Sequence, residues 1–139
     1  MNEANLILLG QYHYQHVTDA EFDMRHYRQQ GDFVVNFWGA SNCGTVGCAL
    51  GHAPLVPGLK VEPKDFSGAG CLDFDKYCER VFGFSAYNEP KWHWLFSDVW
   101  ADRDNTRHGF IRRLIHLLRG GSLDDEFVEG ISASGIMEL

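Results

Sequence analysis

The sequence lacks the features that define several large classes of protein. Its 139 residues include no run of about eighteen apolar residues, so we expect no transmembrane helix. The opening M-N-E-A-N has no basic region of the kind that begins a signal peptide, and we expect a soluble protein of the cytoplasm. No G-x-x-x-x-G-K motif is present, which excludes a P-loop. Internal repeats and low-complexity tracts are absent from the sequence as well.

Positive charge is scarce, since 12 Lys and Arg oppose 19 Asp and Glu and the net charge is -7. Proteins that bind nucleic acids normally present a basic face, so we expect no direct binding of DNA or RNA. The acidic residues are unevenly placed, because the tail 122–139 contains several of them and no Lys or Arg. This distribution leaves docking on a basic protein partner open.

The composition is that of a globular domain, with 45% apolar and 14% aromatic residues. A chain of this length suits one domain and can bury a core without metals or disulfides. In the absence of a secretory signal, the four cysteines are expected to be reduced thiols.

Hydrophobic spacing and capping residues predict a mainly α fold. The predicted helices cover residues 3–16, 43–52, 73–83, 90–100 and 106–119. Residues 32–39 are rich in β-branched and aromatic side chains and fit a strand or an extended connector equally well. We expect a single compact domain over residues 1–121, with about five helices, long irregular loops and at most one short strand pair. The acidic C-terminal tail, residues 122–139, either frays or packs on that domain.

Residues 41–54 concentrate Cys, Gly and His, and we expect them to form the centre of the domain. Ser41 or Asn42 can cap a helix there, and Pro54 ends it. Three interior glycines cost roughly 3 kcal/mol relative to alanine, so tertiary packing must hold this helix. A glycine stripe lets aromatic rings approach closely. The expected structural hub consists of Cys43, Gly44, Gly47, Cys48, Gly51, His52, Trp92 and Trp94.

Five segments together resemble a family of small uncharacterised bacterial and phage proteins. They read F-D-M-R-H-Y at 22–27, C-G-T-V-G-C-A-L-G-H-A-P at 43–54, Y-C-E-R-V-F-G at 77–83, W-H-W-L-F at 92–96 and D-N-T-R-H-G-F at 104–110. The resemblance covers most of the chain up to about Gly121 and leaves the acidic tail outside. It implies a phage or mobile-element setting and supplies no activity.

A cysteine-dependent hydrolase is one alternative. The segment N-C-G-T-V-G-C at 42–48 looks like the start of papain-like and bacteriocin-processing peptidases, with Cys43 as the nucleophile at a helix N-terminus. His93 would then act as the base, and Asp98 or Asp102 would orient it. No Gln precedes Cys43 closely to complete an oxyanion hole, and the apolar arc of the predicted helix carries Cys43 inward. These features count against the hydrolase.

A structural zinc site is the second alternative. Cys48 and His52 could bind zinc together with Cys71 and either Cys43 or Cys78. The spacings C-x4-C and C-x6-C miss the usual two to four residues, which weakens this interpretation. The pair His13 and His16 is typical of a helix face rather than of a metal site.

The preferred interpretation is a non-enzymatic module that binds a host or bacterial protein. It depends on the small size, the incomplete catalytic constellations and the one-sided acidic tail. We expect neither a cofactor nor a membrane to take part in this function. If the alternative zinc site is correct, zinc is the cofactor.

Overall fold

The computed structural model describes residues 1–24, 29–30, 33–34, 48–66, 72–84, 89–124 and 128–139, with the backbone alone for 29–30 and 33–34. Its α-helices are α1 (Glu3–His16), α2 (Ala49–His52), α3 (Phe74–Phe82), α4 (Pro90–Phe96), α5 (Trp100–Arg103) and α6 (Arg107–Leu118). Four 3-10 helices, η1 to η4, cover Asp19–Glu21, Ala53–Leu55, Pro63–Asp65 and Ala133–Glu138. The predicted class, mainly helical with long irregular loops, is confirmed.

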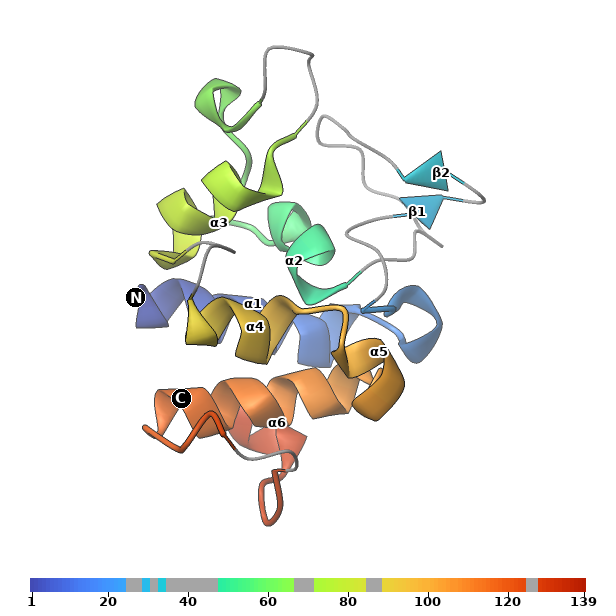
Figure 1. Cartoon of the computed structure of the whole chain (residues 1–139), viewed down its shortest axis with the longest axis vertical. Coiled ribbons are helices and arrows are strands. Elements are labelled where there is room, and N and C mark those ends of the chain that lie inside the picture. Colours follow the sequence, from blue (N-terminus) through green and yellow to red (C-terminus); the bar gives the residue numbers. More distant parts are fainter. Residues whose placement is uncertain (25–28, 31–32, 35–47, 67–71, 85–88, 125–127) are drawn as a thin grey trace.

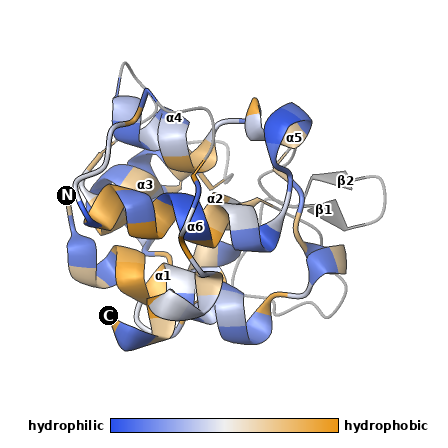
Figure 2. Ribbon diagram, turned by 90° about the horizontal axis from the view of Figure 1, so that it is seen from below, coloured by the Kyte–Doolittle hydropathy of each residue, from blue (hydrophilic) through white to orange (hydrophobic). Residues whose placement is uncertain are grey.

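The helices form three layers (Figure 1). α2 and α3 lie on one side, α1 and α4 form the middle, and α6 closes the other side together with η4. Viewed along the perpendicular direction, α6 runs across the molecule between α1 and α4 (Figure 2). Segments from both halves of the sequence therefore share one interior.

Local capping explains why three helices begin or end where the sequence predicts. Asn2 Oδ1 accepts from Asn5 N at the start of α1, and the Asp73 carboxylate accepts from two backbone N–H groups at the start of α3. Thr106 Oγ1 accepts from Gly109 N at the start of α6. Gly83, with φ +82°, ends α3 in the left-handed conformation that glycine adopts without strain. These signals act within a few residues and are therefore readable from sequence.

The helix predicted over residues 43–52 is wrong at Cys48. Cys48 has extended backbone angles, φ -75° and ψ 176°, and is the N-cap of α2. Its Sγ accepts from Gly51 N at 3.4 Å, so the thiol satisfies a donor that a longer helix would have bonded to a carbonyl. Residues 43–47, which include Cys43, Gly44 and Gly47 of the predicted hub, lie outside the described residues.

The single helix predicted over residues 90–100 is also wrong, because it breaks at Ser97 into α4 and α5. Ser97 is extended, with ψ 144°, and its Oγ accepts from Val99 N at 3.3 Å. A serine side chain that bonds the following backbone offers the chain an alternative to the helical hydrogen bond. Val99 follows this break, and its side chain is 46% exposed.

Of the two alternatives for residues 32–39, a strand or an extended connector, a strand is observed over two residues. β2 (Phe33–Val34) pairs antiparallel with β1 (Gln29–Gln30), and Gln29 lies opposite Val34. The partner was not visible in the sequence because a ladder is made by backbone groups, which glutamine supplies as well as any residue. Residues 35–39 lie outside the part of the chain that the structure describes.

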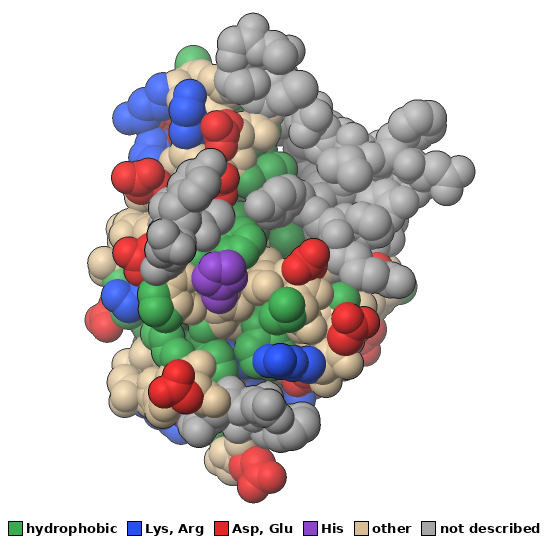
Figure 3. Space-filling view, viewed as in Figure 1, with side chains coloured by type: hydrophobic (Ala, Val, Ile, Leu, Met, Phe, Trp, Pro, Cys, Tyr) green, Lys and Arg blue, Asp and Glu red, His purple; other side chains and the backbone are tan. Residues whose placement is uncertain are grey.

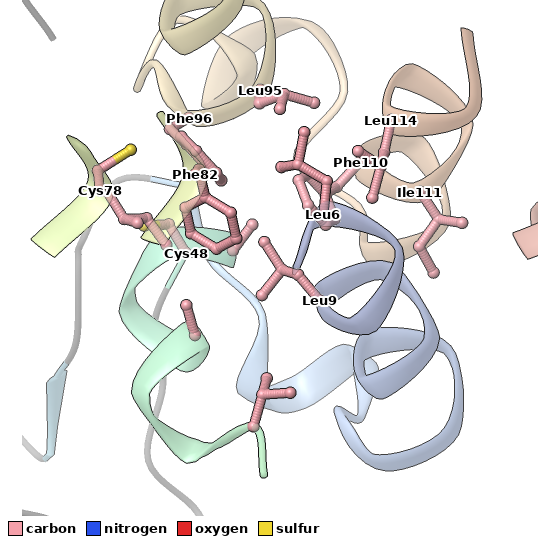
Figure 4. Close-up of a cluster of buried hydrophobic side chains, with 14 of the residues drawn as sticks. Leu6, Leu9, Cys48, Cys78, Phe82, Leu95, Phe96, Phe110, Ile111 and Leu114 are labelled. Atoms are coloured by element: carbon pink, nitrogen blue, oxygen red, sulfur yellow. The ribbon is translucent and has the colours of Figure 1, made fainter. Parts of the chain in front are cut away.

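One hydrophobic core joins all three layers (Figure 4). α1 contributes Leu6 and Leu9, the start of α2 contributes Cys48, α3 contributes Cys78 and Phe82, α4 contributes Leu95 and Phe96, and α6 contributes Phe110, Ile111 and Leu114. Each of these side chains is at most 2% exposed.

The end of the acidic tail packs on the domain. Ile136 of η4 is fully buried, and its carbonyl accepts from Gln11 Nε2 of α1 at 3.1 Å. A Cβ added at Gly10 would lie 2.7 Å from Leu114 and 2.8 Å from Ile136, so the small residue allows α1, α6 and η4 to meet closely. Val128 and Ile131 pack partly buried against the core, whereas Phe127 lies outside the described residues.

Replacing Leu114 with alanine should lower the free energy of unfolding by about 2 to 5 kcal/mol, because a fully buried leucine leaves a cavity when it is truncated. Leu8→Ala is the matched control, since Leu8 lies on α1 and is 40% exposed. We expect the free energy of unfolding of that control, measured in urea, to lie within about 0.5 kcal/mol of the parent's value. Equal midpoints for the two variants would contradict the placement of α6.

Candidate functional site

The structure describes His93, Asp98 and Asp102 of the predicted hydrolase, whereas its nucleophile, Cys43, lies outside the described residues. His93 is exposed on α4, and its carbonyl accepts from Trp100 Nε1 at 3.0 Å. Asp98 and Asp102 are exposed on either side of the start of α5. The proposed nucleophile, base and orienter therefore stay a prediction.

The residues of the predicted zinc site are described in part. Cys71 and Cys43 lie outside the described residues, whereas Cys48, His52 and Cys78 are buried. His52 Nε2 lies 2.7 Å from the carbonyl oxygen of Glu21, so this nitrogen donates and is not free to bind a metal. Within the described residues, no three His, Cys, Asp or Glu side chains converge as metal ligands.

The two described thiols sit in an apolar environment that disfavours the reactive thiolate. Burial raises the pKa of Cys48 to about 11, although backbone N–H groups around the thiol act in the opposite direction. Burial also raises the pKa of Cys78, which lies in α3 and is fully buried. A cysteine nucleophile needs the reverse shift.

Iodoacetamide at neutral pH should therefore leave Cys48 and Cys78 unlabelled in the folded protein and label both in guanidinium chloride. The thiolate is the reacting species. Burial disfavours the charged thiolate and also keeps the reagent away from the sulfur. Peptide mass mapping identifies the labelled positions. Modification of Cys48 in the native protein at the rate of the unfolded control would contradict its buried position.

A buried pair of histidines lies between α1 and α2. The rings of His13 and His52 meet edge to face with centroids 5.7 Å apart. His13 Nδ1 lies 2.8 Å from the carbonyl oxygen of Leu9, which fixes the proton on that nitrogen. Burial, together with a smaller contribution from the nearby His52, lowers the pKa of His13 to about 3. His16, three residues further along α1, is exposed.

Two of the segments that carry the family resemblance meet at the start of α6. Asn105 Oδ1 accepts from Met24 N at 2.7 Å, and Asn105 Nδ2 donates to Asp23 at 3.2 Å. Arg107 donates from one guanidinium nitrogen to the carbonyl oxygens of His13 and Tyr14 at the end of α1. These contacts give the D-N-T-R-H-G-F segment a structural role in joining α6 to α1 and to residues 22–24.

Gly109 in the same segment lies against the side chain of Asp104. A Cβ added there would clash with the Asp104 carboxylate, so a larger residue would displace that side chain. That carboxylate also lies 4.0 Å from the guanidinium groups of Arg112 and Arg113. The negative charge beside the first turn of α6 is thus supplied by the chain itself.

The predicted hub tryptophans lie on different sides of α4. Trp94 is buried and packs on Trp100 with ring centroids 5.4 Å apart, and it also contacts His116. Trp92 is partly buried and meets Phe96 edge to face. Trp94 therefore supports the contact of α4 with α5 and α6.

A pocket of about 310 Å³ opens between α4, α5 and the segment that follows α6, and we call it the α4–α5 pocket. Its lining consists of Pro90, His93, Trp94, Val99, Trp100, Arg103, Leu123 and Asp124. On the face that carries α4 and α5, hydrophobic side chains gather around a histidine, with acidic side chains at the edges (Figure 3). An apolar floor with a polar rim is the anatomy of a protein-binding surface.

Trp100 is held rigidly at this pocket. The guanidinium carbon of Arg113 lies 4.1 Å from the centroid of its ring, and Arg113 Nε donates to the carbonyl oxygen of Trp94 at 3.2 Å. In return, Trp94 Nε1 donates to the carbonyl oxygen of Arg113 at 2.9 Å. Burial lowers the pKa of Arg113 to about 9, so this contact is made at the cost of desolvating a charge. The ring of Trp100, which is 4% exposed, is therefore fixed in place where it lines the pocket.

Sequence reasoning missed Val99 and Leu123 as lining residues of one pocket. Trp100 also lines this pocket but is buried, with 4% of its surface exposed. Val99 is exposed after the break at Ser97, whose Oγ accepts from Val99 N. The serine at that position was the available signal, because serine favours helix termini.

Comparisons with known proteins assign no family, since no protein-family model, curated protein or solved structure matches the chain. In the residues that the structure describes, no helix has both the length and the apolar character to cross a bilayer.

Proposed function

We propose that the chain is a small, non-enzymatic protein-interaction module of a phage or bacterium, which acts in the cytoplasm on a host or bacterial protein. The α4–α5 pocket carries this proposal. Val99 is 46% exposed at its edge, where an apolar side chain gains stability once a partner covers it. Trp100 and Arg103 belong to the residue types that dominate binding energies at protein interfaces.

The size of the pocket supports a protein ligand over a small metabolite. At about 310 Å³ it lies at the lower limit of small-molecule sites, which range from about 300 to 1,000 Å³. Such a volume suits one large side chain of a partner. The remaining contact area would come from the surface around the pocket, as in most interfaces.

Substitution of Val99 by aspartate tests the proposal. An acidic side chain at the mouth of the pocket should oppose the docking of an apolar group and lower the recovery of a cross-linked partner from bacterial lysate about tenfold. Val99 is 46% exposed, so an aspartate there stays in contact with water and the variant should fold. Leu8→Asp is the matched control, because Leu8 is similarly exposed on α1.

The parent and Leu8→Asp proteins should capture the same partner in equal amounts. The comparison uses the full chain, because Leu123 and Asp124 line the pocket and Ile136 of the tail is buried in the core. Failure to capture any protein above background, or equal capture by Val99→Asp and Leu8→Asp, would count decisively against the proposal.

A further inference from the structure

Carboxylates outnumber cations around the α4–α5 pocket. Asp124 lines it, and the exposed Asp98 and Asp102 flank the lining residues Val99 and Arg103 along α5. Acidic side chains are visible at the edges of the hydrophobic patch on this face (Figure 3). Glu89 and Lys91 flank the lining residue Pro90 and offset one another. In the remaining set, three carboxylates against one guanidinium make the rim negative.

The one cation in this set is directed toward the pocket's own aromatic ring. The guanidinium carbon of Arg103 lies 5.9 Å from the centroid of Trp100, within the range of a cation–π contact. With this charge engaged on Trp100, the carboxylates dominate the potential that an approaching partner meets.

We infer that the α4–α5 pocket binds a basic amphipathic segment of the partner protein, an inference that rests on the proposed function. One large apolar side chain of the segment seats against Trp100. Lys or Arg side chains that flank this anchor lie beside Asp98, Asp102 and Asp124. An acidic segment would bring like charges together at the same rim, and a nucleic acid would bring its phosphates against these carboxylates.

The apolar anchor and the charged rim have separate roles. Burial of the anchor supplies affinity, because the ring of Trp100 is fixed before binding and loses little freedom. The carboxylates select the sign of the partner's charge and accelerate association, an effect that salt screens. Binding is therefore expected to depend on both Val99 and ionic strength.

Selection of short random peptides displayed on phage, with the full chain as bait, tests the inference. Enriched peptides should carry Lys or Arg on both sides of a Leu, Phe or Trp, and synthetic copies should bind the parent protein and Leu8→Asp equally. Val99→Asp should abolish this binding. A protein that combines Asp98→Asn, Asp102→Asn and Asp124→Asn should bind about tenfold more weakly, as three exposed charge pairs are lost.

The outcomes separate the inference from the function on which it rests. Thermal melts first establish that the triple variant is folded, which its exposed positions favour. The inference of a basic partner is overturned if the selected peptides need Val99 but have an acidic or uncharged consensus. It is also overturned if they bind the triple variant as tightly as the parent protein. In both cases the proposal of an interaction module still stands. A selection that yields no peptide dependent on Val99 overturns both.

Discussion

Replacing Phe110 with alanine should lower the free energy of unfolding by about 3 to 5 kcal/mol. Phe110 is fully buried at the point where the layers meet. Its ring lies 5.0 Å from that of His13 and 6.2 Å from those of Phe22 and Phe96, measured between centroids. Truncation removes the burial of the ring and leaves a cavity between rigid aromatic neighbours that cannot collapse into it.

Urea denaturation followed by far-ultraviolet circular dichroism measures this loss. Phe110→Leu is the matched control, because it keeps an apolar side chain and should cost less than about 1.5 kcal/mol. A smaller loss for alanine than for leucine would show that Phe110 does not occupy the junction of α1, α4 and α6.

Acidification from pH 7 to pH 5 should remove about 2 kcal/mol of stability through His13 alone. Burial lowers the pKa of His13 to about 3, below the value near 6.5 in the unfolded chain. The unfolded state therefore binds the proton first as the pH falls. The contribution of His13 is fully present above about pH 6.5 and is lost as the pH falls from there toward 3.

Denaturation curves at several pH values check this prediction. His13→Phe fills the same apolar space without a titrating group, so its stability should fall less between pH 7 and pH 5 than that of the parent. Leu8→Ala is the control on the same helix, and it should keep the parent's slope because it changes no titratable group. A slope unchanged by His13→Phe would contradict a neutral, buried imidazole at this position.

The chemistry of the buried groups agrees with a structural role for them. Cys48 caps α2, His52 donates to the carbonyl oxygen of Glu21, and His13 donates to that of Leu9. Each of these side chains makes a hydrogen bond within the fold, and burial shifts the pKa values of Cys48 and His13 toward their uncharged forms. The surface that combines exposed apolar and charged side chains lies instead at α4 and α5.

The predicted hub shows what hydrophobic spacing can predict and what it cannot. Helical periodicity correctly placed Leu50, Gly51 and His52 in a buried helix. It extended that helix through Cys48, because the hydrogen bond from Gly51 N to the Cys48 thiol is not encoded in apolar spacing. The same limitation applies to Ser97 and the exposure of Val99.

The sequence by itself determined the helical class and the bounds of α1, α3 and α6, because caps such as Asp73, Thr106 and Gly83 act on backbone groups within four residues. The tertiary structure alone decided which groups are buried together. The contact of His13 with His52, the bond from Asn105 to Met24 and the packing of Arg113 on Trp100 join different segments of the chain. Such contacts depend on how helices pack in three dimensions, and no local pattern records that arrangement.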